Sequence, residues 1–171
     1  MIEDRARKIK LLVLDVDGVL TDGRIIYDNF GNEIKCFNVL DGFGIKLLKD
    51  AGIKPAIITA KKTKIVKRRA KDLGIEHVYY GFDKLSLYQS LIKRLNIKDE
   101  EVCFMGDDLF DLAVLKKVGF SACPPNAVEE VKETVHYITE KEGGKGAVRE
   151  LIEVILKSRD EWGSVVSSYS I

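Results

Sequence analysis

The chain alternates short apolar runs with longer segments in which apolar residues recur three and four positions apart. Six runs are almost continuously apolar, as parallel strands buried on both faces are: KLLVLD, PAIIT, HVYYG, EVCFMGD, GFSAC and HYIT. Five intervening segments have helical spacing, and several end in Gly or Asn: GFGIKLLKDAG, KTKIVKRRAKDLG, DKLSLYQSLIKRLN, DLFDLAVLKKVG and NAVEEVKETV. This alternation predicts an α/β fold, in which a doubly wound, mostly parallel sheet carries helices on both faces.

Two segments depart from the alternation. RIIYDNFGNEIKCF, residues 24–37, has apolar and aromatic runs on both sides of DNFGN, which is typical of a β-hairpin projecting from the first strand. This insertion is too short to be a separate cap domain. Beyond the last helical segment, GAVRELIEVILKS, the end RDEWGSVVSSYSI has little periodicity. We therefore expect one domain over residues 1–158 and a mobile C-terminal tail over residues 159–171.

The composition is that of an ordinary globular protein. The chain has 171 residues, of which 46% are hydrophobic and 32% charged, and this suits one domain with a substantial core. Its formal net charge of +1 provides no overall field that would attract nucleic acid or an anionic membrane. The N-terminus has no signal-peptide stretch, and no segment approaches the roughly 20 apolar residues that span a bilayer. We expect no nucleic-acid partner, no export and no membrane insertion.

The cysteines indicate a cellular compartment. Cys36, Cys103 and Cys123 are odd in number, lie in apolar contexts and lack Cys-x-x-Cys spacing. This pattern favours buried thiols in a reducing compartment over disulfides or a zinc site. The sequence therefore predicts a cytoplasmic protein.

Chemically reactive side chains follow four of the predicted strands. In chain order they are Asp15 and Asp17, Thr59, Lys84, and finally Asp107, Asp108 and Asp111. Because ligands bind at the carboxyl ends of the strands in an open parallel sheet, we expect these side chains to meet at one edge. Such a set suits phosphoryl transfer through an aspartyl-phosphate.

Two aspartates and two further groups have predicted roles in that reaction. Asp15 would attack phosphorus as the nucleophile. Asp17 would protonate the leaving alkoxide and later deprotonate the water that hydrolyses the intermediate. Thr59 would donate a hydrogen bond to a phosphoryl oxygen, and Lys84 would neutralise charge and hold Asp15 in place.

The reaction also needs a cation, because a carboxylate and a phosphate repel each other. A hard, oxygen-liganded Mg²⁺ offsets this repulsion. Asp107 would complete the metal shell, while Asp108 and Asp111 would support it from outside, directly or through water.

The motifs DVDGVLTDG, Thr59, Lys84 and GDDLFD, in this order, resemble those of the haloacid dehalogenase-like hydrolase superfamily. Longer stretches, among them KCFNVLDGFGIKLLKDAGI, CFMGDDLFDLAVLKKVG and GGKGAVRELIEVIL, are similar to the 3-deoxy-D-manno-octulosonate 8-phosphate phosphatase family. The resemblance implies a Mg²⁺-dependent phosphatase of a sugar-acid phosphate in lipopolysaccharide precursor synthesis. It also implies a homo-oligomer, specifically a tetramer.

The resemblance assigns residues as well. It implies metal binding by Asp15, Asp17 and Asp107. It implies substrate contacts by Asp17, Asn38, Val39, Leu40, Asp41, Gly42, Lys46, Lys61, Arg69 and Lys84. Lys61 stands in Thr-Ala-Lys where the family commonly has Thr-Gly-Arg, and Lys46 stands where an arginine often occurs. Lysine keeps the charge but cannot form a bidentate fork with a carboxylate.

Charge gives a separate reason to expect a sugar acid. Mg²⁺, Thr59 and Lys84 already serve the phosphoryl group. If Lys46, Lys61 and Arg69 face the same crevice, they supply more positive charge than a neutral alcohol phosphate needs. A distant carboxylate on the substrate would use this charge.

Several alternatives stay open at this point. The substrate could be another sugar-acid phosphate, such as a nine-carbon 9-phosphate. A receiver-like phosphoacceptor domain has a similar inventory, but receivers place the acidic pair first and the phosphoacceptor later. A domain that has lost catalysis is a third class. Asp22 is predicted to be a plain turn residue, and the loop EGGKG is either a flexible connector or a segment that closes over substrate.

The missing cap bears on assembly. Without a cap, a neighbouring subunit's surface could cover the site. The apolar residues of the hairpin, Ile25, Ile26, Tyr27 and Phe30, would be unfavourable as an exposed patch, and this indicates an interface in residues 24–37.

Overall fold

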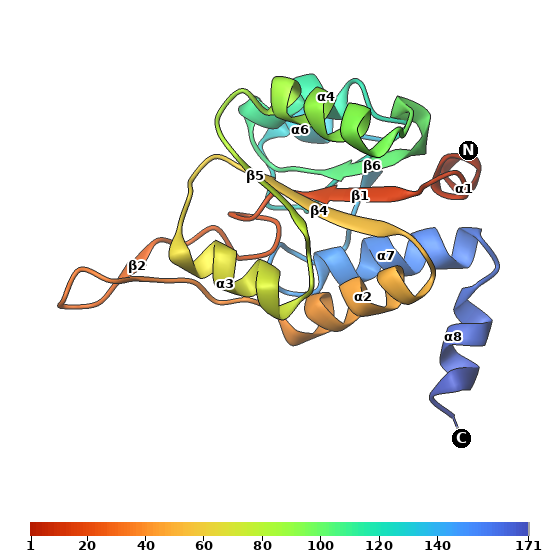
Figure 1. Ribbon diagram of the computed structural model, residues 1–171, viewed down its shortest axis with the longest axis horizontal. Coiled ribbons are helices and arrows are strands. Elements are labelled where there is room, and N and C mark those ends of the chain that lie inside the picture. The colour runs from red at the N-terminus through yellow and green to blue at the C-terminus, as the bar shows by residue number, and fades with distance from the viewer. Residues whose placement is uncertain (171) are drawn as a thin grey trace.

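A six-stranded sheet with the strand order β5-β4-β1-β6-β7-β8 forms the middle layer of the fold. The computed structural model describes residues 1–170 (Figure 1). The strands are β1 (Leu11–Leu14), β4 (Lys54–Thr59), β5 (His77–Tyr80), β6 (Val102–Met105), β7 (Phe120–Cys123) and β8 (Tyr137–Ile138). All five pairings between them are parallel. The six predicted strands and the doubly wound α/β class are confirmed.

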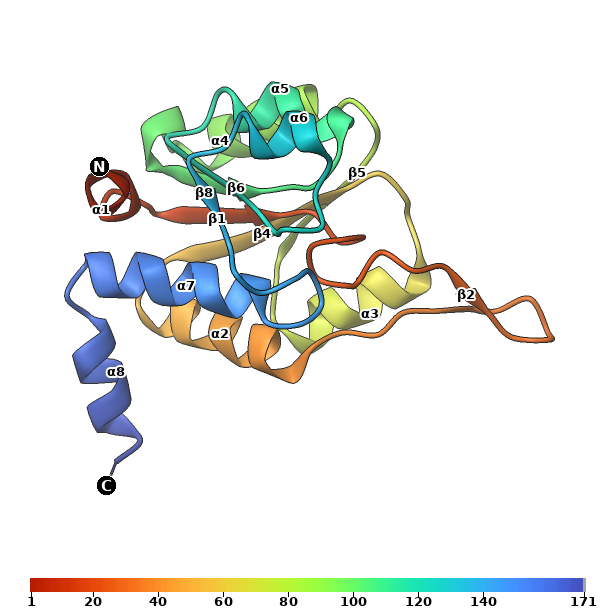
Figure 2. The same cartoon turned by 180° about the vertical axis from the view of Figure 1, so that it is seen from behind.

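Helices cover both faces of this sheet. They are α1 (Ile2–Ala6), α2 (Val39–Asp50), α3 (Lys64–Asp72), α4 (Lys84–Leu95), α5 (Leu112–Leu115), α6 (Glu129–Lys132), α7 (Ala147–Ser158) and α8 (Trp162–Ser168), with 3-10 turns η1 (Asp99–Glu101) and η2 (Leu109–Asp111). Helices α2, α3 and α7 lie on one face, and α4, α5 and α6 lie on the other (Figures 1 and 2).

Two predicted helices are shorter than the apolar spacing indicates. The segment 108–119 is α-helical only in α5, because the side chain of Asp111 binds the preceding backbone and holds it as a 3-10 turn. The segment 126–135 is α-helical only in α6, and Val128 before it is extended. In both cases local hydrogen bonds and backbone geometry override the periodicity.

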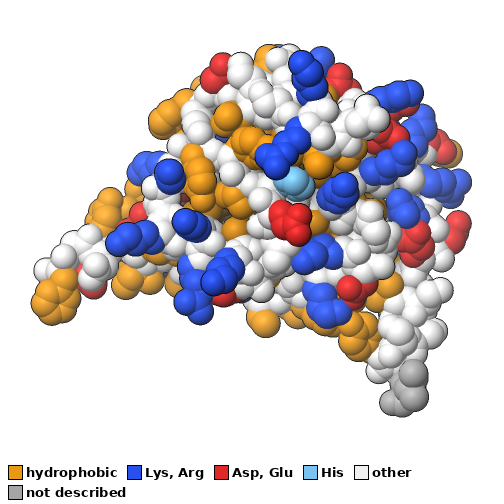
Figure 3. All heavy atoms as spheres, viewed as in Figure 1, with side chains coloured by type: hydrophobic (Ala, Val, Ile, Leu, Met, Phe, Trp, Pro, Cys, Tyr) orange, Lys and Arg blue, Asp and Glu red, His pale blue; other side chains and the backbone are white. Residues whose placement is uncertain are grey.

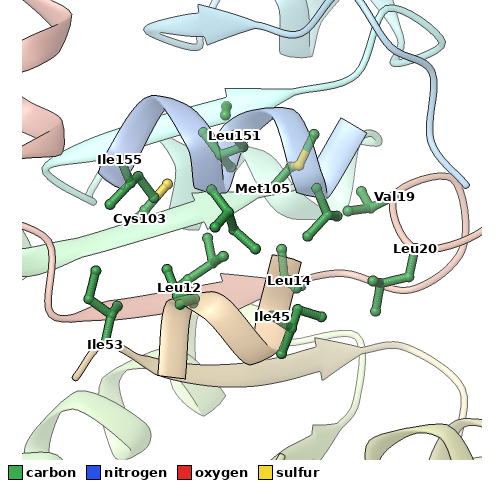
Figure 4. Close-up of a cluster of buried hydrophobic side chains, with 14 of the residues drawn as sticks. Leu12, Leu14, Val19, Leu20, Ile45, Ile53, Cys103, Met105, Leu151 and Ile155 are labelled. Atoms are coloured by element: carbon green, nitrogen blue, oxygen red, sulfur yellow. The ribbon is translucent and has the colours of Figure 1, made fainter. Parts of the chain in front are cut away.

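The core follows the alternation of side chains along β1. Leu12 and Leu14 pack on the side of α2 and α7, in one buried cluster with Ile45 and Leu151 (Figure 4). Leu11 and Val13 point the other way, into the cluster beneath α4 and α5. A strand buried on both faces therefore holds the residues that follow it in a fixed position.

The predicted hairpin is present as β2 (Ile26–Tyr27) and β3 (Glu33–Ile34), which pair antiparallel. It projects from the body of the molecule, and hydrophobic atoms lie at its far end (Figures 1 and 3). Phe30 at the tip is 91% exposed, and Ile25 and Tyr27 are exposed as well. Between β1 and α2 the described chain carries this hairpin and no cap domain.

The C-terminal segment contains a helix that the sequence pattern does not predict. In α8, Trp162 is partly buried, and the guanidinium of Arg149 lies 5.3 Å from its ring. Tyr169 contacts Phe43 edge-on at 5.5 Å between ring centroids. The expected mobility of residues 159–171 stays a prediction, and Ile171 lies outside the described residues.

Two predictions from composition can be compared with the structure. Cys103 and Cys123 are buried free thiols, as expected, but the prediction is wrong for Cys36, which is exposed beside the hairpin. Within residues 1–170, no helix has the length and apolar character that crossing a membrane requires.

Candidate active site

The carboxyl ends of the central strands bring the predicted residues together. β1 pairs with β4 on one side and with β6 on the other, so the chain after each of these strands emerges at the same edge. A cavity of about 190 Å³ opens there. It is lined by Asp15, Asp17, Gly23, Thr59, Ala60, Asp107, Asp108 and Phe110. Residues of the first, second and fourth motifs therefore meet at one edge of the sheet, as the sequence predicts.

Lys84 lies beneath this cavity, between two carboxylates. Its Nζ is 2.9 Å from Asp15 Oδ2 and 2.6 Å from Asp111 Oδ1, and all three side chains are buried. Asp83 begins α4 by accepting a hydrogen bond from the backbone of Ser86, and this places Lys84 in the first turn. Burial alone would lower the pKa of Lys84, but the two carboxylates raise it above its usual value. The ammonium is therefore charged and fixes the orientation of Asp15.

Asp111 connects this lysine to the loop that follows β6. Its Oδ1 accepts from Lys84, and its Oδ2 accepts from the backbone N–H groups of Asp107 and Asp108 at 2.9 and 3.2 Å. The backbone of Gly106 packs so closely that a Cβ there would lie 2.5 Å from the Asp111 carboxyl carbon. Both oxygens of Asp111 thus accept hydrogen bonds within the chain, and the supporting role predicted for it stays a prediction.

Three carboxylates crowd together at this edge. One oxygen each from Asp15, Asp107 and Asp111 lies within 4.8 Å of the others. Burial, together with the charge of Asp111, raises the pKa of Asp15 to about 6, against the opposing effect of Lys84. Burial and the charges of Asp15 and Asp111 raise the pKa of Asp107 to about 8. A hard divalent cation would relieve this repulsion, and carboxylate oxygens are the ligands that it prefers. The donor set therefore fits Mg²⁺.

Asp17 has a different environment from Asp15. Its carboxylate is not part of the three-carboxylate cluster, and its side chain is 41% exposed. Its Oδ1 lies 2.5 Å from Nζ of Lys35, which also contacts Glu33 at 2.9 Å. Lys35 comes from the hairpin and was not singled out in the sequence, because nothing in a lone hairpin lysine indicates a contact 18 positions away.

The turn after β1 is packed against distant backbone. Gly18 has φ +84°, and a Cβ there would overlap the carboxylate of Asp107. Asn126 donates to the carbonyl of Gly18 and accepts from the N–H of Gly143, at 2.9 and 2.8 Å. The EGGKG loop therefore packs on the turn through Gly143 and is no loose connector. Asp22 accepts from the N–H of Arg24, as expected of a turn residue.

Two residues that are predicted to contact substrate, Asn38 and Asp41, make hydrogen bonds within the chain itself. Asn38 caps α2 by accepting from the N–H groups of Leu40 and Asp41. Asp41 is buried, and its Oδ1 accepts from the N–H of Arg149 in the first turn of α7. Val39 and Leu40 are exposed. Asn38 and Asp41 thus connect the start of α2 to Arg69 of α3 and to Arg149 of α7, and their substrate contacts stay predictions.

The predicted cationic contacts lie apart from the carboxylates. Val39, Gly42, Lys46 and Arg69 line a separate cavity of about 370 Å³ between α2 and α3. Arg69 donates to the carbonyl of Asn38 at 3.3 Å, and Lys46 pairs with Asp50 at 2.6 Å. Lys61 is exposed after β4 and lines neither this cavity nor the one at Asp15. One copy of the chain does not bring these cations into the cavity at Asp15, and their substrate roles stay predictions.

Comparison with known proteins adds independent information. A family profile described as haloacid dehalogenase-like hydrolase matches residues 75–152. The chain is 44% identical over 158 residues to 3-deoxy-D-manno-octulosonate 8-phosphate phosphatase of Yersinia pestis, an overlap that covers 92% of this chain and 84% of that protein.

Two solved structures are also similar. The phosphatase of the same name from Moraxella catarrhalis, in complex with magnesium ion, phosphate ion and KDO, has a TM-score of 0.96 and 44% identity. The match covers 98% of this chain and 97% of that one. The cobalt-bound deoxy-D-mannose-octulosonate 8-phosphate phosphatase of Haemophilus influenzae has a TM-score of 0.88 and 38% identity, with 91% and 92% covered.

Proposed function

The chain belongs to the 3-deoxy-D-manno-octulosonate 8-phosphate phosphatase family of haloacid dehalogenase-like hydrolases, and we propose that it hydrolyses 3-deoxy-D-manno-octulosonate 8-phosphate to the free sugar acid and phosphate. The main support is the buried ammonium of Lys84, which contacts the carboxylates of Asp15 and Asp111. Asp107 lies beside them, and the chain is 44% identical to phosphatases of this family. The sequence-based resemblance is confirmed. The receiver-like alternative is not favoured, because the family profile and the relatives described above are hydrolases.

Mg²⁺ is the cofactor of this reaction, and Asp15 and Asp107 would hold it. When bound, Mg²⁺ supplies positive charge that offsets the repulsion between anions and polarises the phosphoryl oxygens. Asp111 would support the site without binding the metal, because both of its oxygens already accept hydrogen bonds. Metal binding by Asp17 and support by Asp108 remain part of the proposal.

The reaction proceeds in two steps on the residues of this chain. A carboxylate oxygen of Asp15 attacks phosphorus, the bond from phosphorus to the sugar oxygen breaks, and Asp17 gives that oxygen a proton. Water then attacks the phosphorus of the aspartyl-phosphate while Asp17 takes a proton from it, the bond from phosphorus to the Asp15 oxygen breaks, and phosphate leaves with the Asp15 carboxylate restored. Thr59 donates a hydrogen bond to a phosphoryl oxygen. Lys84 holds Asp15 and offsets the charge on the phosphoryl group.

A homo-oligomer, most specifically a tetramer, is part of the same proposal. The exposed apolar tip of the hairpin supports it, because such a patch is unfavourable in water. The cations Lys46, Lys61 and Arg69 do not line the Asp15 cavity, and a second copy packed over the site could complete the contacts of the substrate carboxylate. Light scattering at micromolar concentration tests the assembly, and an active monomer would exclude it.

The cytoplasm is the proposed location. The free thiols of Cys103 and Cys123 support it, because a reducing compartment keeps such thiols from forming disulfides.

Kinetics on a panel of sugar-acid phosphates tests the substrate. The panel includes the octulosonate 8-phosphate and a nine-carbon 9-phosphate, with Mg²⁺ present and Asp15→Asn as the inactive control. The octulosonate 8-phosphate should have the highest kcat/KM. A higher value for the nine-carbon compound would replace the named substrate while leaving the phosphatase assignment intact.

A further inference from the structure

Lys35 is a buried cation that lies outside the four sequence motifs. It follows β3 at the base of the hairpin, and its side chain is 3% exposed. Its Nζ is 2.5 Å from Asp17 Oδ1 and 2.9 Å from Glu33 Oε1. The lysine therefore joins the hairpin to the turn that follows β1.

This contact differs from an ordinary surface ion pair. Exposed pairs contribute about 0–1 kcal/mol, because water screens them and the long side chains lose rotamer freedom. A buried ammonium, by contrast, is unfavourable unless it is paired and hydrogen-bonded. The buried ammonium of Lys35 thus needs a carboxylate partner, and its shorter contact is with Asp17, which is held in return.

The contact also determines which oxygen of Asp17 is available. Oδ1 accepts from Lys35, and within residues 1–170 no hydrogen bond to Oδ2 is found. Asp17 lines the same cavity as Asp15 and Thr59. A proton donor must lie within hydrogen-bond reach of the atom it serves, and a misplacement of about 1 Å can cost roughly 10²-fold in rate.

We propose that Lys35 is a positioning residue, which holds the Asp17 carboxylate in the orientation from which Oδ2 serves the leaving oxygen and the hydrolytic water. The inference rests on the proposed function. In that reaction the sugar oxygen keeps the electron pair of the broken bond to phosphorus and takes the proton from Asp17. Lys35 does not line the cavity at Asp15, so in this proposal it acts on the reacting atoms through Asp17.

Leaving-group dependence tests this role. Lys35→Met is compared with the wild type by rapid quench of the first turnover, with Mg²⁺ present. The substrates are the octulosonate 8-phosphate, whose alkoxide needs a proton, and 2,4-dinitrophenyl phosphate, whose leaving group departs without one. We expect kcat for the sugar-acid phosphate to fall on the order of 10²-fold, with a smaller change in KM. The first-turnover rate for the aryl phosphate should fall by less than about threefold, since no proton is required.

Two further variants serve as controls. Lys35→Arg keeps the charge and should restore most of the rate. Glu33→Gln removes the other carboxylate partner but leaves the contact with Asp17, and it should have a small effect. If Lys35→Met does not fold, Lys35→Gln gives the same comparison, and the rate with the aryl phosphate reports an intact site.

The outcomes separate this inference from the proposed function when Asp17→Asn is measured in parallel. If Asp17→Asn shows the leaving-group dependence and Lys35→Met loses both substrates equally, or loses neither, the inference is overturned and the function stands. If the wild type releases no sugar acid, or Asp17→Asn slows both substrates equally, the role of Asp17 fails and the inference fails with it.

Discussion

Replacing Lys84 by methionine removes the only cation between two buried carboxylates in the described part of the site. Nζ of Lys84 lies 2.9 Å from Asp15 and 2.6 Å from Asp111, with all three side chains buried. Removing one partner of a buried ion pair costs about 3–5 kcal/mol, because the remaining charge is left without compensation. For a domain of this size that corresponds to a melting temperature lower by roughly 6–20 °C.

The cost should depend on pH. Without Lys84 the pKa of Asp15 rises above its present value of about 6, so the folded variant binds a proton more tightly than the unfolded chain does. The destabilisation is therefore small below the unfolded pKa of about 4 and grows as pH rises through the raised folded value.

Urea denaturation with a chelator present, at pH 5 and pH 8, measures both effects. Lys93→Met is the matched control, because Lys93 is exposed on the same helix. The double variant Lys84→Met/Asp111→Asn should recover part of the loss, since it removes one uncompensated carboxylate. A loss below about 1 kcal/mol, or an equal loss at both pH values, would refute the reasoning, because a buried pair costs more than an exposed one.

Other predictions concern catalysis, metal binding, specificity and packing. Asp15→Asn should form no aspartyl-phosphate in acid-quench labelling, because the nucleophile is gone, and substantial turnover by a verified variant would contradict its role. Mg²⁺ binding should release protons, and its affinity should rise as pH increases through the pKa values of about 6 and 8 of Asp15 and Asp107. Calorimetry in buffers of different ionisation enthalpy checks this, and a pH-independent affinity would count against it. Arg69→Ala should raise KM for the sugar-acid phosphate far more than for a small aryl phosphate, and equal effects would assign Arg69 to the phosphate or the fold. Gly143→Ala should lower the melting temperature, because its Cβ would overlap the carbonyl of Gly18, and an unchanged value would show that the loop can move aside.

The sequence predicts the elements whose signal is local. The six strands are continuous apolar runs, and Asp15, Thr59 and Asp107 follow three of them, so the parallel order alone brings these residues together. Lys84 is also found as predicted, because it opens a helix in the first turn after a strand. Asp111 accepts hydrogen bonds from Lys84 and from the N–H of Asp107, and its supporting role toward the metal stays a prediction.

The unpredicted features depend on contacts between distant segments. Lys35 reaches Asp17 only because the hairpin folds back over the turn, and Asn126 reaches Gly18 across 108 positions. The spacing of apolar residues along the chain does not indicate contacts between such distant positions. Helix α8 was not predicted because most of its residues are small or β-branched, and Trp162 gains its partners on α7 only after folding. The sequence also does not indicate which cavity Lys46 and Arg69 line, because that depends on how α2 and α3 pack.

The central position of β1 has a consequence for how the site would respond to heat. Leu11–Leu14 is paired on both sides and covered on both faces, so its amide hydrogens should exchange with solvent only when the whole domain opens. Within one chain, the hairpin that carries Lys35 is held by a pairing of two residues on each side, so in an isolated subunit it should open far more often than β1. Asp15 therefore follows a strand of high local stability, whereas Lys35 lies on a hairpin of low local stability. With Lys35 positioning Asp17 as proposed, warming an isolated subunit should slow protonation of the leaving group before it affects the attack of Asp15 on phosphorus.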